Sequence, residues 1–503
     1  MISLSKNIIA NLSINIWLAF LSLILTPFYV GFLGVESYGL IGFYFSWMAI
    51  LGILDAGISS TAIREMAWLA ARPEEKGKTP SLLLSLEVVY WGIILILGVG
   101  ILAGAWFLGA EWFQAKDLSP EVIRETLILM AISLVVQVPS GLYVSGMMGL
   151  QRQVECSSLL GMFGTIRGVG AVLVLWLIKP DIRVFFIWQF VVSIFQTGVI
   201  RWYLWKIVSV EGQPARFSMK ILQSIKGFAR GMILITALGI MITQADKMIL
   251  SRMVSMEAFG FYMLAWTVVS GFSRVSGPLV QAFYPRFTQM VSKGDFDNLS
   301  KQFRLVSQLM SVLILPPCAL IVFLSEPILF AWTGNQVVVN GVAPILVVMV
   351  LGSVLAASSH SAACILYSKH QLSPVIVINL MCALVLLPLL IVAVNYFDVM
   401  GGAYIWGLYG LILYVSYQVY GFQETTKIKL LLLAVKDFLV PCMASFVVAG
   451  AASLWLNNVE GKFVFVGLLS FTLVVGWLVA LWMCRDLFNI VSEKLRWKLK
   501  TSH

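Results

Sequence analysis

The chain alternates long apolar runs with short polar segments from one end to the other. Each run is close to the length of about 20 residues that a helix needs to cross a bilayer, so the pattern predicts fourteen membrane-spanning helices. Because fourteen is even, both termini are expected on the same side. The predicted spans are 7–33, 38–60, 82–108, 126–148, 155–178, 184–205, 231–252, 259–284, 303–325, 343–366, 374–395, 402–422, 438–457 and 463–483.

Composition also favours an all-α, polytopic membrane protein. Of the 503 residues, 60% are hydrophobic and 12% are charged, against about 45–50% and about 25% in soluble domains. In hydrocarbon, each backbone polar group has to be satisfied inside its own helix. The first apolar run is too long for the core of a signal peptide and lacks a clear small-residue cleavage site, so we expect it to remain as a helix.

The net charge of +10 indicates membrane topology rather than nucleic-acid binding. Of the Lys and Arg residues in predicted loops and tails, 25 fall on the side that holds both termini and 6 on the opposite side. Cytoplasmic loops carry this excess in membrane proteins. Both termini are therefore expected in the cytoplasm, and nucleic acid is not an expected partner.

An internal repeat relates the two halves of the chain. Gly34-Val-Glu-Ser-Tyr-Gly39 follows the first predicted helix, and Ser255-Met-Glu-Ala-Phe-Gly260 follows the seventh, at a shift of 221 residues. Two further loop matches keep nearly the same shift. Helices 1–6 therefore correspond to helices 7–12 in the same orientation, as in a parallel repeat about an axis along the membrane normal.

The repeat predicts two pseudo-symmetric six-helix lobes plus two extra C-terminal helices. The segments are an N-lobe at 1–205, a linker at 206–230, a C-lobe at 231–425, and helices 13 and 14 with a basic tail at 426–503. In the linker, apolar residues at helical spacing lie among Lys and Arg. This pattern predicts an amphipathic helix on the cytoplasmic membrane surface.

Polar residues in predicted helices 1, 7 and 8 gather on one side of each helix, at about 100° per residue. Such groups are costly in hydrocarbon and usually face a cavity or a partner helix. One interpretation is a water-filled cavity between the lobes; the other is interhelical hydrogen bonding that holds the bundle together. The repeat puts a stripe on the first helix of both copies, which favours the cavity. The candidate cavity residues are Asn11, Asn15, Thr243, Gln244, Asp246, Lys247, Thr267, Ser270, Arg274, Gly277 and Gln281.

Three basic side chains inside predicted helices are candidates for binding an anionic headgroup: Arg167, Lys247 and Arg274. Arginine in particular matches the geometry of phosphate. The alternative is structural ion pairing or snorkelling to the interface. Asp246 and Lys247 are adjacent, and adjacent residues of a helix do not face each other. Each is therefore expected to have another partner, and Asp246 is a candidate partner for Arg274.

Asp55 and His360 are candidates for ion coupling, the histidine because it can titrate near neutral pH. The alternatives are an ion pair with Arg64, for Asp55 and likewise for Glu87, and a hydrogen-bonded packing role for His360. Asp55 lies near the cytoplasmic end of helix 2, and His360 lies among serines of helix 10.

Two glycine pairs, Gly100/Gly104 and Gly164/Gly168, have the spacing that lets helices pack closely. The six cysteines are scattered and form no CxxC pair, which predicts neither a zinc site nor a disulfide framework. No metal-ligand spacing, cofactor motif or catalytic constellation is visible. We therefore expect no metal, no cofactor and no enzymatic activity.

Three segments, in their order among fourteen helices, carry a family resemblance. They are Phe28–Gly39, the loop Gly149–Gln153, and Asp246–Ser251 running into Glu257 and Gly260. The layout resembles the polysaccharide transporter branch of the multidrug/oligosaccharidyl-lipid/polysaccharide exporter superfamily, especially O-antigen flippases, over nearly the whole chain.

The resemblance implies a V-shaped pair of lobes with alternating access, in the bacterial inner membrane. It implies an undecaprenyl-diphosphate-linked oligosaccharide as cargo, for polysaccharide or lipopolysaccharide synthesis, and no nucleotide hydrolysis. Membrane lipids and glycan polymerase or assembly proteins are the other implied partners. Helices 13 and 14 are expected to line a groove for the lipid tail.

The sequence leaves other functional classes of membrane protein open besides a flippase. Lipid II flippases carry basic residues in the first helix, which here has none after Lys6, and drug exporters usually have twelve helices. A cation-coupled drug antiporter would need an essential membrane carboxylate, with Asp55 or Asp246 as candidates. A membrane glycan polymerase or acyltransferase would need charged catalytic residues in the outside loops, which are short here.

Overall fold

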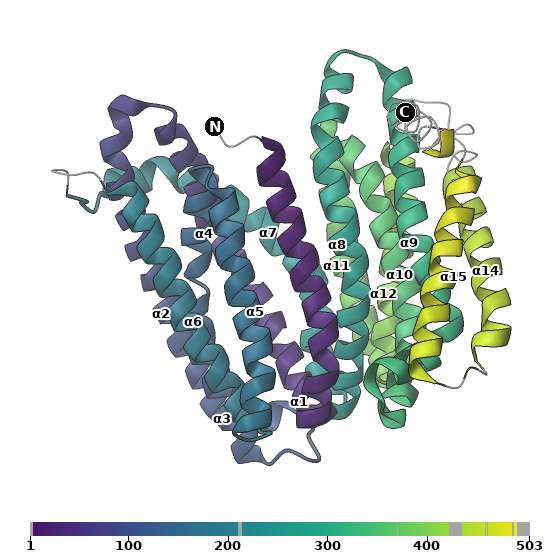
Figure 1. Ribbon diagram of the computed structural model, residues 1–503. Coiled ribbons are helices and arrows are strands. Elements are labelled where there is room, and N and C mark those ends of the chain that lie inside the picture. The colour runs from purple at the N-terminus through teal and green to yellow at the C-terminus, as the bar shows by residue number, and fades with distance from the viewer. Residues whose placement is uncertain are drawn as a thin grey trace, which may run out of the picture. The chain divides into compact units, whose positions relative to one another are not determined.

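The computed structural model describes residues 4–209, 214–369, 371–421, 435–457, 459, 461–484 and 487–489. These residues are almost entirely helical and form no sheet (Figure 1). Eleven helical stretches among them are long and apolar enough to cross a membrane. The prediction of an all-α, polytopic membrane protein is confirmed, while the count of fourteen helices stays a prediction. The chain forms two compact units, Met1–Gly260 and Phe261–His503.

The described part of unit 1 contains seven α-helices, one short 3₁₀ helix and the first residues of α8. They are α1 (Leu4–Ala70), the 3₁₀ helix Pro73–Lys78, α2 (Thr79–Trp112), α3 (Pro120–Gln137), α4 (Ser140–Gly149), α5 (Gln153–Leu177), α6 (Ile182–Val208) and α7 (Met219–Met253). Residues 219–230 are the first turns of α7 rather than a separate helix. Their position on the membrane surface stays a prediction. The boundaries of the two lobes also stay predictions.

The first copy of the repeated motif divides α1 into two helical parts. Gly34 has φ 79°, a left-handed conformation that favours glycine. Two residues later, the Glu36 carboxylate accepts hydrogen bonds from the backbone N–H groups of Lys116, Asp117 and Leu118 at 2.8, 2.9 and 3.3 Å. The acidic residue of the motif therefore fixes the connection between α2 and α3.

The two copies of the motif touch each other within unit 1. A Cβ added at Gly260 would lie 2.3 Å from the Val35 carbonyl oxygen, and one at Gly39 would lie 3.1 Å from the Met256 carbonyl oxygen. The repeat aligns Val35 with Met256 and Gly39 with Gly260. The contact of Gly39 with Met256 is therefore the counterpart of the contact of Gly260 with Val35. Such reciprocal contacts are typical of parts related by a two-fold axis, and they explain why both motifs end in glycine.

The predicted fourth helix is interrupted at Pro139, between α3 and α4. Proline has no N–H and its ring clashes with the carbonyl four residues earlier. Side-chain donors reach carbonyls beside the break: Oγ1 of Thr197 donates to the carbonyl of Val136 at 2.8 Å, and the Tyr90 hydroxyl lies 3.1 Å from the carbonyl of Val138, which also accepts from the backbone N–H of Gly141. The break leaves Gln137 at the end of α3.

The two predicted glycine pairs behave differently. A Cβ at Gly164 would lie 2.4 Å from Cδ2 of Leu18, and one at Gly168 would lie 2.6 Å from Cδ1 of Leu25. This pair packs α5 against α1, as predicted. Gly100 and Gly104 have no atom within 4 Å of such a Cβ, so the prediction of close packing is wrong for them, because no described atom of unit 1 comes close to that side of α2.

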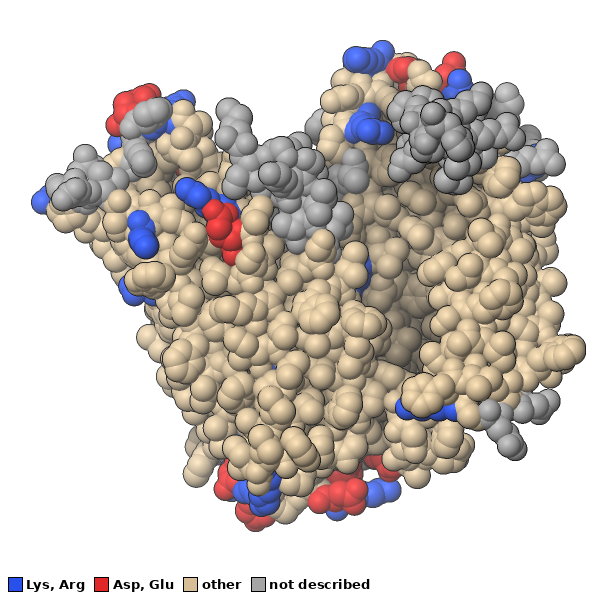
Figure 2. Space-filling view, in the orientation of Figure 1, with Lys and Arg blue, Asp and Glu red and all other residues tan. Residues whose placement is uncertain are grey.

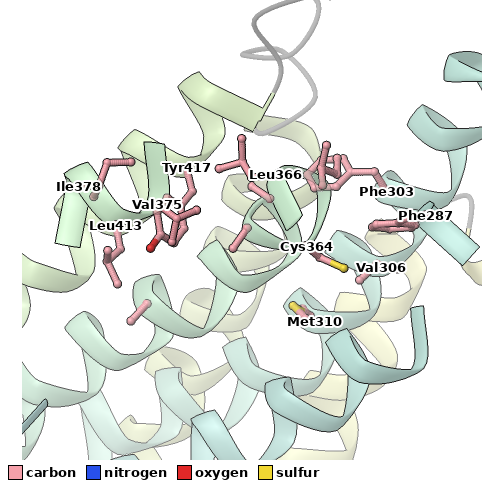
Figure 3. Packing of buried hydrophobic residues seen from close by; sticks show 14 of the residues in the cluster. Phe287, Phe303, Val306, Met310, Cys364, Leu366, Val375, Ile378, Leu413 and Tyr417 are labelled. Carbon is pink, nitrogen blue, oxygen red and sulfur yellow. The ribbon is translucent and has the colours of Figure 1, made fainter. Parts of the chain in front are cut away.

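Unit 2 consists of the rest of α8 and the helices that follow. They are α8 (Met256–Ser292), α9 (Phe296–Thr333), α10 (Gln336–Ser368), α11 (Leu372–Phe397), α12 (Val399–Gly421), a π-helical turn at Val435–Leu439, α14 (Val440–Leu456) and α15 (Lys462–Met483). A core cluster joins α8 to α12, with Phe287, Met310, Cys364, Val375 and Tyr417 among its members (Figure 3).

The helix pair α14 and α15 packs on α9. Arg304 of α9 donates to both carboxylate oxygens of Asp437 at 3.1 and 3.3 Å, and Nε2 of Gln308 donates to the same carboxylate at 2.8 Å. Asp437 is buried, so this ion pair fixes the start of the added helices. No sequence signal pointed to it.

The surface agrees with a bilayer as solvent. Large apolar side chains such as Tyr396, Trp455 and Phe463 are 81%, 79% and 92% exposed. On the visible face of either unit, charged side chains collect near the helix ends and leave the middle almost uncharged (Figure 2). This distribution matches an apolar zone between two polar interfaces.

Candidate substrate site

The polar stripe predicted on the eighth helix lies on the less buried side of α8. Thr267 and Ser270 are half-buried and Arg274 is exposed, whereas Phe272 and Ser276 on the other side are buried in unit 2. The hydroxyls of Thr267 and Ser270 donate to carbonyls of α8 itself. The stripe is therefore a polar helix face that the rest of unit 2 leaves largely uncovered.

Arg274 is the charged residue of this stripe. Among the described residues of unit 2, none forms a hydrogen bond or an ion pair with its guanidinium. A guanidinium offers five N–H donors in a planar fork that fits phosphate oxygens. An arginine facing lipid in the middle of a helix costs at least about 2.5–3.5 kcal/mol. Of the neighbouring candidate Gln281, the structure describes only the backbone.

Arg167 of α5 has a very different environment. Its Nη1 donates to Oε1 of Gln137 and of Gln189 at 2.9 and 3.0 Å, and its Nη2 donates to Oε1 of Gln196 at 2.8 Å and to Oγ of Ser193 at 3.3 Å. All four partners are neutral. They come from α3 and α6, so the guanidinium links three helices of unit 1.

We call this group the Arg167 cage: Arg167 with Tyr44, Gln137, Gln189, Ser193 and Gln196. The Tyr44 hydroxyl completes it by donating to Oε1 of Gln137 at 2.9 Å. Of the described carboxylates, none lies within ion-pair distance of Arg167. Neutral acceptors thus bind both terminal nitrogens of the guanidinium without cancelling its charge.

Sequence reasoning found Arg167 but missed its partners. Gln189, Ser193 and Gln196 recur at i, i+4 and i+7 along α6, which is one face of a helix. That polar stripe was the available signal. The contribution of Gln137 depends on the break at Pro139, and the contribution of Tyr44 depends on the packing of α1 against its neighbours, neither of which helix spacing encodes.

Asp246 and Lys247 of α7 pair with each other. Nζ of Lys247 lies 3.1 Å from both carboxylate oxygens of Asp246 and donates to the Thr243 carbonyl at 2.8 Å. The expectation that these adjacent residues do not contact each other is wrong. The long lysine stem folds back along the helix, because Lys247 is only 1% exposed and a charge in that environment needs a counter-charge.

The other candidates of the predicted cavity lie on α1 and α7. Asn15 is exposed, while Thr243 and Gln244 are half-buried. The Thr243 hydroxyl donates to the Gly239 carbonyl of its own helix at 3.1 Å. Of Asn11 the structure describes only the backbone. Their contact with substrate stays a prediction.

The acidic groups near the helix ends have partners other than Arg64. Asp55 accepts hydrogen bonds from Ser59 Oγ at 2.5 Å and from the Tyr90 hydroxyl at 2.7 Å. Glu87 pairs with Arg201 at 2.5 Å, so its predicted pairing with Arg64 does not form. Asp55 therefore has neutral hydrogen-bond donors and keeps the chemistry of a membrane carboxylate.

His360 packs between α10 and α8. Its Nδ1 lies 2.9 Å from Oγ of the fully buried Ser276. This contact matches the hydrogen-bonded packing role that the sequence left as one alternative. Its part in ion coupling stays a prediction.

Comparison with known proteins now defines the class. A family model described as "Polysaccharide biosynthesis protein" matches residues 4–291, which is more than half of the chain, and the MatE model matches residues 231–392. The chain is 23% identical over 351 residues to the "Uncharacterized membrane protein EpsK" of Bacillus subtilis (strain 168), covering 68% of this chain and 67% of the relative.

Two solved structures are similar in fold. One is the "Lipid II flippase MurJ, inward closed conformation", with a TM-score of 0.71 and 15% identity, covering 95% of this chain and 99% of the other. The second is the inward-facing conformation of a multidrug resistance MATE family transporter of the MOP superfamily, with a TM-score of 0.64 and 14% identity, covering 85% and 98%.

Fold and family models together define a multi-pass membrane transporter of the multidrug/oligosaccharidyl-lipid/polysaccharide exporter superfamily. Within it, the chain belongs to the polysaccharide biosynthesis protein family. The resemblance stated from the sequence is thereby confirmed.

Proposed function

We propose that this transporter is a flippase for undecaprenyl-diphosphate-linked oligosaccharide in the bacterial cytoplasmic membrane. The observation that carries the proposal is the match of residues 4–291 to the polysaccharide biosynthesis protein family. The lipid II flippase, whose fold this chain shares, has by its name a lipid-linked cargo as well. The proposed product enters polysaccharide or lipopolysaccharide synthesis, with glycan polymerase or assembly proteins as partners.

The uncovered face of α8 supplies the chemistry for such a cargo. A diphosphate carries negative charge and acceptor oxygens, which the Arg274 fork can contact bidentately. The hydroxyl oxygens of Thr267 and Ser270 beside it can accept hydrogen bonds from sugar hydroxyls. In this scheme the two lobes alternate access with both termini in the cytoplasm, and the chain hydrolyses no nucleotide.

The test is deletion of the gene in its host, followed by measurement of lipid-linked oligosaccharide on each face of the membrane. Complete oligosaccharide should accumulate where only cytoplasmic reagents reach it, and surface glycan should fall. Plasmid-borne wild-type chain should restore both. Normal glycan export in the deletion strain would contradict the proposal.

A cation-coupled drug antiporter is the second candidate, because residues 231–392 match MatE and Asp55 offers a membrane carboxylate with neutral partners. It predicts increased drug sensitivity in the same deletion strain. Drug sensitivity of the deletion strain that the wild-type chain reverses and the Asp55→Asn variant does not, with glycan export normal throughout, would support the antiporter over the flippase.

A further inference from the structure

Unit 1 contains an apolar cavity of about 510 Å³ between α1, α2 and α3, with Met248 of α7 in its wall. This volume is typical of small-molecule sites, which span about 300–1,000 Å³. Aromatic side chains of α1, among them Phe43, Tyr44 and Trp47, line one side. Ile96 of the wall is 74% exposed, so the cavity opens at the surface of unit 1.

The cavity is wide because of the glycine pair on α2. Gly100 and Gly104 lie one helical turn apart, and both belong to the wall. A Cβ at either position would meet no atom within 4 Å. The small side chains of Ala105 and Ala131 also line the cavity. The spacing that usually brings two helices together here leaves room for a ligand.

The side chains that line the cavity favour a hydrocarbon ligand. The lining residues include no Asp, Glu, Lys, Arg or His. The Tyr44 hydroxyl already donates to Gln137, and Nε1 of Trp112 already donates to Ser251. Sugar hydroxyls or a cationic drug would therefore be buried without partners, which is costly.

We propose that this cavity binds the polyisoprenoid tail of the lipid-linked cargo, an inference that rests on the proposed function. A chain with methyl branches is wider than a straight acyl chain and fits the space opened by the two glycines. Its double bonds present π-faces, which suit aromatic walls. The proposed tail site thus lies within unit 1.

One wall residue connects the cavity to the Arg167 cage. The Tyr44 ring lines the cavity, and its hydroxyl donates to Gln137, which also accepts from Arg167. A tail packed against this ring therefore lies beside the group that links α3, α5 and α6. The occupied cavity would hold α1, α2 and α3 at a fixed separation.

The experiment is photolabelling of the purified full-length protein with a polyprenyl phosphate that carries a diazirine at the end of its tail. Label should appear in peptides of α1, α2 and α3 that line the cavity. Gly100→Leu should lose this label to background, because the new side chain fills the space without a clash. Gly92→Leu is the matched control: it lies on the same helix, has equally open space and is outside the wall, so its labelling should equal wild type.

Competition identifies the occupant. Excess unlabelled polyprenyl phosphate should displace the label, and excess phosphatidylglycerol should not. Equal displacement by both lipids, unchanged labelling of Gly100→Leu, or label confined to other helices would overturn the proposal. Because this assay uses no oligosaccharide and no transport, labelling in the cavity together with normal glycan export in the deletion strain would reject the proposed function alone.

Discussion

Arg167 and Arg274 are alike in sequence and different in structure. Each lies inside a long apolar helix, and each is a candidate for the anionic headgroup. Arg167 donates to four neutral side chains from two other helices. Arg274 lies on the uncovered face of α8, where the described residues of unit 2 offer it no such partner.

The difference separates a cation that holds the protein together from one that is available to a ligand. Burying a charge is tolerable when its N–H groups are hydrogen-bonded, and the Arg167 cage provides acceptors for both terminal nitrogens of the guanidinium within unit 1. A cation without protein partners keeps its hydrogen-bonding capacity for water or for a ligand. We therefore propose that Arg274 binds the headgroup and that Arg167 has a structural role.

The largest effect is expected for Arg274→Ala, which should abolish export of the lipid-linked glycan while the protein accumulates normally in the membrane. Arg274→Lys should keep part of the activity, because a point charge cannot make the forked contact. Complementation of a flippase-deficient strain, with membrane protein quantified in parallel, measures both outcomes. Arg286→Ala removes the same charge from the same helix outside the stripe and should retain export. Full export by Arg274→Ala would remove this residue from the site.

The next largest effect concerns the buried pair on α7. Lys247→Met leaves the Asp246 carboxylate buried without its cation, and breaking a buried pair costs about 3–5 kcal/mol. Membrane protein levels should fall sharply. The double variant Asp246→Leu/Lys247→Met should recover most of the level, because replacing both charges by apolar groups is often neutral. A double variant that accumulates and still exports glycan would show that Lys247 is structural; one that accumulates without exporting would return it to the substrate site.

Much of this fold follows from residue spacing. Apolar runs of membrane length, the break at Gly34 and the repeated Gly39 and Gly260 are all visible in the sequence, and the structure gives the glycines a physical reason. These features depend on local backbone geometry or on a period along one helix. Spacing alone therefore predicts them.

The partners of a side chain depend on packing between helices, which spacing does not encode. Gly164/Gly168 and Gly100/Gly104 have the same pattern, yet only the first meets another helix. The pairing of Lys247 with Asp246 depends on burial that forces the lysine to fold back. The role of Arg167 depends on Gln137, which belongs to a different helix.

A smaller effect is expected for Arg167→Leu. The cage would lose the donor that serves three glutamine oxygens. A buried acceptor without a partner costs about 1–3 kcal/mol. Interhelical hydrogen bonds in a membrane protein average about 0.6 kcal/mol. We expect a loss of stability of about 2–4 kcal/mol in total, measured as a lower unfolding temperature in detergent. Glycan export per molecule of folded protein should be retained. Wild-type stability combined with lost export would reverse the assignments of Arg167 and Arg274.

The smallest effect is expected for Tyr44→Phe, which removes one hydroxyl from the Arg167 cage and leaves the ring in place. Oε1 of Gln137 would still accept from Arg167 and from Ser193, so the loss should be near 1 kcal/mol or less. The unfolding temperature should drop slightly, and export should not change. Tyr404→Phe, which removes an exposed hydroxyl from α12, is the control and should leave both quantities at wild-type values. Because a structural cage tolerates the loss of one donor among several, a Tyr44→Phe variant that folds fully but fails to export would mean that the cage takes part in transport.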